Sequence, residues 1–389
     1  MTVVNPNTST SRHRERLLVR GVNWLGDAIM TTPALERLRE SHPHAFIAML
    51  TPEKLAGLWS HLPWVDDLIV FAPTDTLRQV AKRLRSGRFD TALVLPNSVR
   101  SALECWLAGI PQRIGYQASW RRWLLTQALP LRPSFQSMRK KSPAEIRRLI
   151  AHALHIPHPL PPVEAHHLFN YLHLATALGA QSKITAPRLF VHNDELSAVA
   201  TQFGLDPARR PVLGINPGAE YGSAKRWPAT HFEAAALEIH HHTRCQCLIL
   251  GGPADQDLAV RIETTLNQSI RNQTQNAGSS LVINAAGKTS LRELCVLLKN
   301  CRVLLTNDTG PMHVAAAVGT AVVVPFGSTS PELTGPGVPG DTRHRLLKTN
   351  SPCAPCFLRQ CPIDFRCMQA IEPQQAVQAV LQLWPQPSV

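Results

Sequence analysis

Two ionisable side chains, Asp308 and His313, flank a short turn near the middle of the second half of the chain. Residues 302–317 predict a buried strand, this polar turn and then a helix of small residues. Such a turn places free backbone N–H groups and the positive end of a helix dipole at the carboxyl end of a strand, where open α/β sheets bind phosphates and nucleotides. Gly310 lets a ligand approach the backbone closely. The alternative is an ordinary strand-to-helix turn capped by Asp308 or Thr309.

A second loop that follows a predicted strand carries positive charge. Residues 216–228 place Lys225 and Arg226 beside small residues. Cations in such a loop neutralise a pyrophosphate. Solvated surface side chains are the alternative, but the neighbouring Gly218 and Ser223 favour a shaped pocket.

A carboxylate stands after the first predicted strand. Residues 16–20 predict that strand, Gly21–Asp27 form a glycine-bounded loop, and a helix is expected over 28–40. The loop is not a GxGxxG dinucleotide fingerprint, because only Gly21 and Gly26 are present. A carboxylate at a helix start normally has a lowered pKa. The alternative interpretation makes Asp27 a helix N-cap.

A third loop, over residues 251–257, follows the predicted strand 246–250 and contains Asp255 and Asp257. An acidic residue after this strand suits a ribose hydroxyl. The Asp-x-Asp spacing also matches a divalent-metal pattern of some sugar-nucleotide enzymes. Helix capping by Asp255 is the third interpretation.

Four of the nine cysteines fall within 15 residues near the carboxyl end of the chain, with the spacing C-x2-C-x4-C-x5-C. This spacing can hold a structural zinc ion tetrahedrally through Cys353, Cys356, Cys361 and Cys367. A disulfide is less favoured in a reducing compartment. The other five cysteines are expected to be small buried hydrophobes: Cys105, Cys245, Cys247, Cys295 and Cys301.

These segments belong to a chain in which predicted strands and helices alternate, which indicates βαβ units and parallel sheets. The predicted strands are 16–20, 45–50, 67–71, 91–95, 212–216, 246–250, 280–284, 302–306 and 321–326, and the predicted helices are 28–40, 77–85, 101–108, 166–178, 231–241, 255–266, 291–298 and 373–383. A length of 389 residues fits two domains. We expect a disordered extension (1–15), two Rossmann-like domains (16–188 and 189–372) and a C-terminal helix and tail (373–389).

Charge is unevenly distributed along the chain. Residues 1–190 carry 24 Lys and Arg against 12 Asp and Glu, whereas residues 191–389 carry 16 against 15. A basic half predicts an anionic partner, such as a phosphorylated substrate, anionic lipid or nucleic acid. A solubilising surface is the alternative. No run of 18 apolar residues and no signal peptide is present, so we expect a cytoplasmic protein without a membrane span.

Taken together, the motifs resemble those of the family 9 glycosyltransferases. The resemblance runs from about residue 16 to 384. It rests on Gly26-Asp27-Ala28-Ile29-Met30 with Pro33, Pro96-Asn97-Ser98, Gly109–Tyr116, Pro217–Gly222 through Lys225-Arg226-Trp227-Pro228, and Asn307-Asp308-Thr309-Gly310 with His313. The N-terminal extension and the cysteine cluster depart from the common pattern.

The resemblance implies a GT-B architecture, in which two Rossmann-like domains face a central cleft, with the acceptor on the first domain and an ADP-sugar on the second. It implies inverting transfer of L-glycero-D-manno-heptose from ADP-heptose to the inner core of lipopolysaccharide. No cofactor or Asp-x-Asp metal is implied for catalysis. The implied partners are ADP-heptose, a phosphorylated lipid A-core acceptor and the cytoplasmic face of the inner membrane, where the protein would be peripheral.

Where positions of this chain match the family's motifs, the resemblance implies a role for the residue. Asp27 resembles the general base, and Lys225 resembles the clamp on the donor diphosphate. The implied donor site comprises Gly218, Ser223, Lys225, Arg226, Asp255, Thr289, Asp308, Thr309, Gly310 and His313. The expected acceptor site comprises Asn23, Trp24, Asn97, Ser98, Arg100, Arg139, Lys140 and Lys141.

Two alternatives remain open at this point. The first is an enzyme of the same architecture that uses another nucleotide sugar or another acceptor position. The second is a non-catalytic nucleic-acid binder, motivated by the basic half. The chain has only 3 Tyr and 11 Phe, and none of them is interleaved with the basic clusters, so we expect no nucleic-acid partner.

Overall fold

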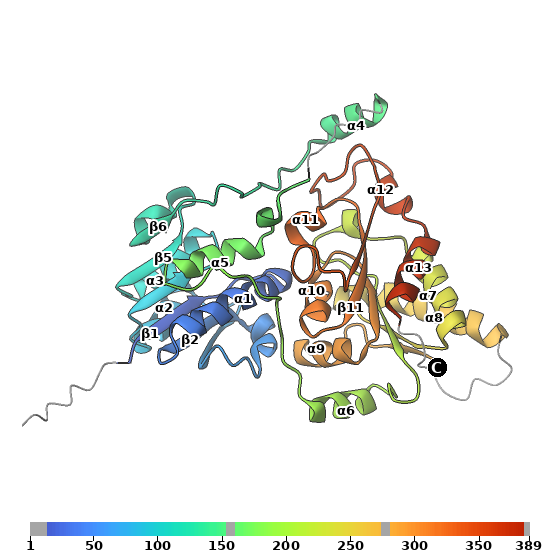
Figure 1. The fold of residues 1–389 in the computed structure, drawn as a ribbon, viewed down its shortest axis with the longest axis horizontal. Helices are drawn as coiled ribbons and strands as arrows, with labels where there is room; N and C mark the ends of the chain where they lie inside the picture. The colour runs from blue at the N-terminus through green and yellow to red at the C-terminus, as the bar shows by residue number, and fades with distance from the viewer. Residues whose placement is uncertain (1–13, 153–159, 274–280, 385–389) are drawn as a thin grey trace, which may run out of the picture.

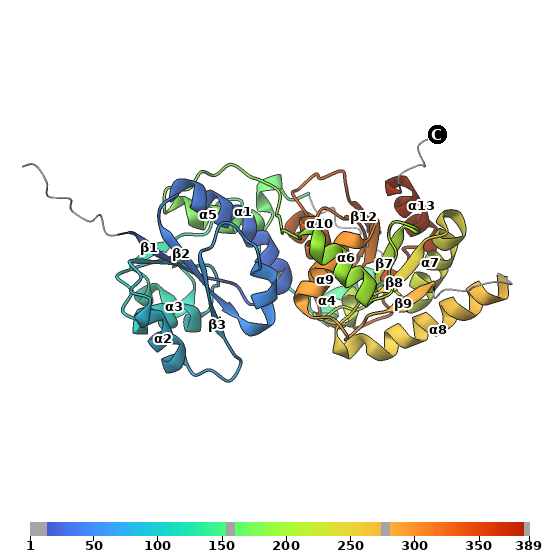
Figure 2. The ribbon, with the colours of Figure 1, turned by 90° about the horizontal axis from the view of Figure 1, so that it is seen from below.

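Two parallel sheets form the framework of the computed structural model, which describes residues 14–152, 160–273 and 281–384. The first sheet has the order β3-β2-β1-β4-β5-β6 and the second the order β12-β11-β10-β7-β8-β9. Each sheet carries helices on both faces, and the two stand side by side (Figures 1 and 2). This confirms the predicted α/β class with two Rossmann-like domains. Most of the expected N-terminal extension, the C-terminal tail and the expected strand start at Ser280 lie outside the described residues.

The strands of the first sheet are β1 (Arg16–Arg20), β2 (Phe46–Pro52), β3 (Asp67–Phe71), β4 (Thr91–Val94), β5 (Gln112–Tyr116) and β6 (Gln127–Leu129). Its helices are α1 (Leu25–Ser41), α2 (Leu77–Ser86), α3 (Val99–Leu107) and α5 (Leu168–Thr176), with short 3₁₀ turns η1 (Glu53–Trp59), η2 (Ser119–Leu124) and η3 (Val163–Ala165). The inner strands β1 and β4 are apolar because helices cover both of their faces.

The strands of the second sheet are β7 (Val212–Asn216), β8 (Gln246–Ile249), β9 (Val282–Asn284), β10 (Val303–Thr306), β11 (Ala321–Phe326) and β12 (Arg345–Lys348). Its helices are α6 (Asn193–Gln202), α7 (Ala229–Thr243), α8 (Gln256–Gln273), α9 (Leu291–Asn300), α10 (Gly310–Ala317), α11 (Pro331–Thr334), α12 (Arg366–Gln369) and α13 (Pro373–Leu383), with 3₁₀ turns η4 (Ser223–Lys225) and η5 (Pro253–Asp255). The last helix, α13, packs on α7 and β11.

The helix α4 (Pro143–Ala151) precedes the linker in sequence but packs away from the first sheet. A long segment carries the chain from β6 to α4, which lies above the second domain in the view of Figure 1. There Ile146 packs with Cys353 and Cys356. The chain therefore reaches the second domain once before the linker, and residues 130–142 run past the junction of the two domains.

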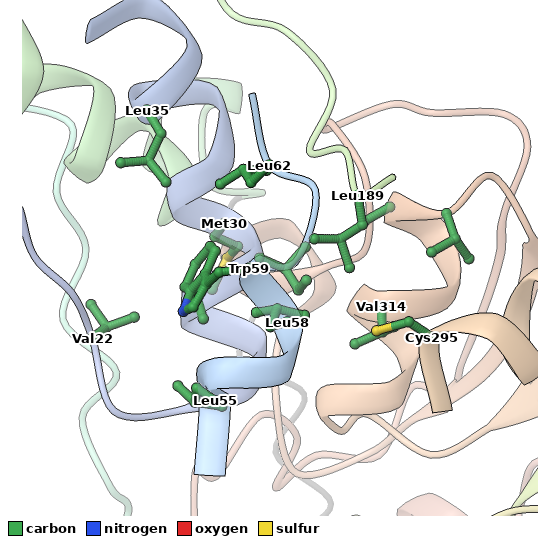
Figure 3. Close-up of a cluster of buried hydrophobic side chains, with 14 of the residues drawn as sticks. Val22, Met30, Leu35, Leu55, Leu58, Trp59, Leu62, Leu189, Cys295 and Val314 are labelled. Atoms are coloured by element: carbon green, nitrogen blue, oxygen red, sulfur yellow. The ribbon is translucent and has the colours of Figure 1, made fainter. Parts of the chain in front are cut away.

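One hydrophobic core runs through the junction of the two domains. Leu55, Leu58 and Trp59 of η1 belong to the same buried cluster as Cys295 of α9 and Val314 of α10 (Figure 3). The linker follows this seam. Arg188 donates its backbone N–H to Thr32 of α1 (3.2 Å), and the next residue, Leu189, donates to Ala317 of α10 (3.0 Å). The domains thus meet in a packed, apolar contact.

No helix among the described residues is long and apolar enough to cross a membrane.

Candidate active site

A cavity of about 450 Å³ lies where the carboxyl ends of the two sheets face each other. Its walls come from the first turns of α1 and α10, the loop after β7, and the segment 138–140. The lining includes eight of the residues expected from the sequence: Trp24, Asp27, Lys140, Lys225, Asp308, Thr309, Gly310 and His313. Residues expected for the acceptor and for the donor therefore share one space.

The first turns of α1 and α10 pack directly against each other. A Cβ at Gly26 would stand 2.7 Å from Cδ2 of His313, and one at Gly310 would stand 2.7 Å from Leu25. Heavy atoms do not approach that closely without a shift of the neighbour. The two glycines therefore allow both helix starts, with their free N–H groups, to face the same cavity.

Asp27 is the third residue of α1, and Trp24 occupies the cap position, so the N-cap interpretation of Asp27 is wrong. The pKa of Asp27 is raised by burial, which outweighs a hydrogen bond from Tyr171 (3.1 Å) and the charge of Lys225. The expectation of a lowered pKa at the helix start is therefore wrong as well. A carboxylate with a raised pKa binds a proton more readily than an ordinary one, as a general base must.

Tyr171 on α5 was not expected from the sequence. Burial raises its own pKa well above the usual range, so the phenol stays protonated and donates to Asp27. The α5 helix packs along α1, which fixes this pair. No motif in the sequence marks Tyr171, because 144 residues separate it from its partner.

Lys225 and Asp308 form a buried ion pair on the donor side of the cavity. The Nζ of Lys225 lies 2.6 Å from Oδ2 of Asp308 and 3.3 Å from its carbonyl oxygen. Thr329 donates its hydroxyl to the same Oδ2 atom (2.6 Å), and the ring of Tyr221 stands 5.0 Å from the ammonium. Asp308 thus orients Lys225 toward the cavity rather than capping α10, whose cap is Thr309.

Asn307 shapes the loop that carries Lys225. Its side chain accepts the backbone N–H of Trp227 (2.9 Å) and donates to the carbonyl of Pro217 (2.7 Å). Trp227 is itself buried and donates its ring N–H to Ile371 (2.8 Å). Both ends of the loop are therefore tied to the turn after β10, so the two donor loops move as one unit.

Two histidines line the cavity in the neutral form at pH 7. The pKa of His313 is lowered to about 4, chiefly by burial; of the nearby charges, Asp308 raises this pKa, whereas Lys225 lowers it. Burial also lowers the pKa of His167 to about 4. The Nε2 atom of His167 is buried and has no hydrogen-bond partner among the described residues. The sequence did not suggest that His167 lines this cavity.

The remaining expected donor residues lie outside the lining of this cavity. Gly218 approaches Asp255 so closely that a Cβ would collide with its carboxylate. Asp255 accepts the backbone N–H of Gly252 (3.1 Å) and pairs with Arg226 at 3.4 Å. This group surrounds the carboxyl ends of β7 and β8. Ser223 opens η4, and Thr289 precedes the cap of α9.

Most of the expected acceptor residues are not brought to Asp27. Arg100 pairs with Glu104 (3.0 Å), Ser98 caps α3, and Asn23 accepts from the guanidinium of Arg20 (3.1 Å). Asn97 is exposed in the loop before α3. Of the expected acceptor residues, only Trp24 and Lys140 line the cavity that contains Asp27.

Arg139 and Lys141 line a second cavity of about 510 Å³ that shares Thr329 and Phe357 with the first. Arg139 pairs with Glu145 on α4 (2.6 Å). Lys141 is buried and donates its Nζ to the carbonyl of Cys353 (3.2 Å). Lys141 therefore ties the segment 136–141 to the second domain, whereas Arg139 makes a local pair with α4.

The cysteine-rich segment packs against α4 and contacts the loop that carries Lys225. All nine cysteines are free thiols, and no group of three or more metal-ligating side chains among the described residues could hold a metal ion. Cys353 and Cys356 pack with Ile146, while Cys361 accepts the backbone N–H of Phe365 (3.3 Å). A zinc ion at Cys353, Cys356, Cys361 and Cys367 stays a prediction from the sequence. The other five cysteines are buried, as expected.

The same segment supports the Lys225 loop. The carbonyl of Arg359 accepts the backbone N–H of Ala224 (3.0 Å), and the carbonyl of Phe357 accepts the hydroxyl of Tyr221 (3.0 Å). Gly222 has a φ of +154° and lies against the Arg359 backbone, where a side chain would collide. The Arg359 side chain lines the active cavity.

Several known proteins are similar to this chain in sequence and in fold. The lipopolysaccharide heptosyltransferase 2 of Escherichia coli K12 is 31% identical over 327 residues, which cover 82% of this chain and 85% of the relative. The lipooligosaccharide heptosyltransferase 2 of Haemophilus influenzae is 28% identical over 85% of this chain and 89% of the relative.

Among solved structures, E. coli ADP-heptose lipopolysaccharide heptosyltransferase II superposes with a TM-score of 0.74 at 27% identity, covering 95% of this chain and 98% of that one. A family 9 glycosyltransferase from Veillonella parvula has the same fold, with a TM-score of 0.72 at 23% identity, over 95% and 97% of the two chains. The model of glycosyltransferase family 9 (heptosyltransferase) matches residues 77–365. This chain is a member of glycosyltransferase family 9.

Proposed function

We propose that this enzyme transfers L-glycero-D-manno-heptose from ADP-heptose to the inner-core heptose of lipopolysaccharide, with inversion at the anomeric carbon. The observation that carries the proposal is one cavity lined by Asp27 of the first domain and Lys225 of the second. A single displacement needs both a base for the attacking hydroxyl and a cation for the departing diphosphate, and these two side chains supply them.

Asp27 acts as the general base. Its carboxylate takes the proton of the acceptor hydroxyl while the oxygen bonds to the anomeric carbon of the donor. Burial raises the pKa of Asp27, whereas Tyr171 holds one carboxylate oxygen. The other oxygen is left for the substrate. Positioned proton transfer of this kind contributes about 10²–10⁴-fold to the rate.

Lys225 and the start of α10 receive the charge that develops on the leaving ADP. Two of the three ammonium protons are directed at Asp308 in the described part of the chain, so the third can meet a phosphate oxygen. The N–H groups near Thr309 and Gly310 add the positive end of the helix dipole. We assign the ribose of ADP to Asp255 and the adenine side to Thr289.

We propose that the acceptor enters beside Trp24, Lys140 and Met138, which line the cavity together with the donor loops. The basic first half faces phosphorylated lipid A and core sugars at the cytoplasmic face of the inner membrane, where each basic residue near the surface contributes about 1 kcal/mol.

Incubation with ADP-heptose and lipopolysaccharide that ends at its first heptose, followed by mass spectrometry, tests the proposal. We expect a mass gain of one heptose. Absence of the gain, or an equal gain on lipopolysaccharide that lacks the first heptose, would contradict it. A heptosyltransferase 3 from E. coli is 22% identical to this chain, against 31% for heptosyltransferase 2, which favours the second-heptose position over other acceptors.

A further inference from the structure

Three tryptophans of the first domain are exposed on one surface. Trp120 and Trp123 of η2 are 85% and 82% exposed, and Trp106 of α3 is 48% exposed. Exposed tryptophans at this level are costly in water unless a partner covers them, because each ring carries a large apolar area. We therefore expect a binding partner to cover the surface that carries these tryptophans.

The tryptophans lie on a single helical layer. The inner sides of α2, α3 and η2 form one buried cluster with the first sheet, and α3 packs against both of its neighbours. Figure 2 shows α2 and α3 side by side on this layer. Within α3, Val99 (42% exposed) precedes Trp106 by seven residues, so both point outward from the same helix face.

Positive charge surrounds the tryptophans. Arg78, Lys82 and Arg85 recur along the exposed face of α2, and the exposed Arg122 separates Trp120 from Trp123. Residues 77–124 contain 9 Lys and Arg but only Asp90 and Glu104 as acidic residues. Glu104 is buried, and Asp90 is not exposed. The layer therefore presents aromatic rings and cations without exposed carboxylates.

Hydrogen bonds of Arg121 join this layer to the loop at the carboxyl end of β4. Arg121, which is buried, donates to the backbone carbonyls of Pro96 and Ser98 in the loop after β4. Because β4 pairs in parallel with β1, this loop lies at the same sheet edge as the loop that leads to Asp27. A partner bound by η2 is thus held on the acceptor side of the first domain.

We propose that the outer faces of α2, α3 and η2 form a docking surface for an anionic phospholipid bilayer. Tryptophan rings partition to the interface between water and hydrocarbon, and arginine and lysine side chains bind acidic headgroups. The inference rests on the proposed function for its purpose, since docking here brings a lipid-anchored acceptor to the Asp27 edge. The argument for lipid binding itself uses only the side chains of this surface.

Binding of the full chain to vesicles tests the proposal. We expect sedimentation with vesicles of equal phosphatidylcholine and phosphatidylglycerol, weak binding to phosphatidylcholine alone, and loss of binding at high salt. The double variant Trp120→Ser/Trp123→Ser should bind about tenfold more weakly, and Arg78→Gln/Lys82→Gln should lose most of the preference for the anionic lipid. The matched control is Val260→Ser/Arg271→Gln on the exposed face of α8, which should bind as wild type.

Assays of heptosyl transfer distinguish the docking-surface proposal from the proposed enzymatic function. The tryptophan variant should retain wild-type turnover on a detergent-free, delipidated core oligosaccharide but lose turnover on acceptor embedded in vesicles. Wild-type binding by that variant, or equal loss in the α8 control, would overturn the docking surface. So would a dimer that buries the tryptophans and does not bind vesicles. Vesicle binding without any heptosyl transfer would refute the proposed function and leave the docking surface standing.

Discussion

The carboxyl group of Asp27 experiences two opposing influences within one turn of helix. Its place at the helix start favours the anion, whereas burial between the domains disfavours it, and burial wins. The same burial holds His313 and His167 neutral. Asp27 is therefore the group among these three whose raised pKa suits it to accept a proton from a sugar hydroxyl.

The acid limb of the pH profile reports on this carboxylate. Activity requires the ionised form, so kcat/KM falls as pH drops through the raised pKa of Asp27. Tyr171→Phe removes a hydrogen bond that lowers this pKa, so the acid limb should move to higher pH. Tyr116→Phe is the matched control, because its hydroxyl bonds Asn170 and His173 instead. An unmoved limb in Tyr171→Phe would argue against Asp27 as the titrating group.

Removal of the Lys225 charge should weaken binding of the diphosphate. Lys225→Met deletes a charge-assisted hydrogen bond, which is worth about 1.5–3 kcal/mol, so the Kd for ADP should rise about tenfold to a hundredfold. Titration calorimetry measures it. Lys288→Met, an exposed lysine of the same domain, should leave the Kd unchanged. If the Lys225→Met and wild-type proteins bound ADP with equal affinity, Lys225 would not be the clamp on the diphosphate.

At the scale of elements, the contact between the starts of α1 and α10 determines whether base and clamp share a cavity. Gly26→Ala places a methyl group within 2.7 Å of the His313 ring. Overpacking of this kind costs about 1–3 kcal/mol, so both the free energy of unfolding and the turnover should fall. Gly57→Ala is the matched control, because its new Cβ would stand 3.4 Å from Arg292 at the same domain junction. Equal effects of the two substitutions would show that the helix contact is unimportant.

The strongly patterned elements were predictable from the sequence, and several weakly patterned ones were not. β1, β7 and β11 match their expected bounds, because apolar runs bounded by polar turns mark strands that helices cover on both faces, and the edge strand β3 matches its bounds as well. By contrast β5, β6, β12, α4 and α6 were not expected. β12 reads Arg-Leu-Leu-Lys, in which apolar and polar residues do not alternate, and β6 spans only 3 residues, so neither has a clear hydrophobic period in the sequence.

The site was predictable where local motifs carry it and unpredictable where long-range packing does. Asp27, Lys225, Asp308 and His313 follow strands, and parallel strands bring such loops to one edge. Tyr171, Thr329 and His167 come from segments without a motif and reach the site through tertiary packing. Lys141 was expected in the acceptor site because it lies in a basic cluster. The structure instead buries its side chain against Cys353.

At the scale of the whole molecule, the apolar seam in Figure 3 joins the two domains into one folding unit. Leu58 of η1 is 0% exposed and belongs to the cluster that includes α9 and α10. Leu58→Ala should lower the free energy of unfolding by about 2–5 kcal/mol. Because the seam is shared, one denaturation transition should shift as a whole.

Leu346→Ala, at a position that is 38% exposed, is the control and should change stability little. Separation of the Leu58→Ala profile into two transitions, with the second domain at its wild-type midpoint, would show that the domains fold independently.

The turnover of Asp27→Asn, measured together with its affinity for ADP, tests the central claim most directly. The amide keeps the size of the side chain but cannot accept the hydroxyl proton, so kcat should fall by about 10²–10⁴-fold. ADP binding, which depends on the Lys225 side of the cavity, should be at least as tight as in the wild type. Turnover close to the wild-type value would contradict the account, because the heptosyl transfer would then proceed without the proposed base.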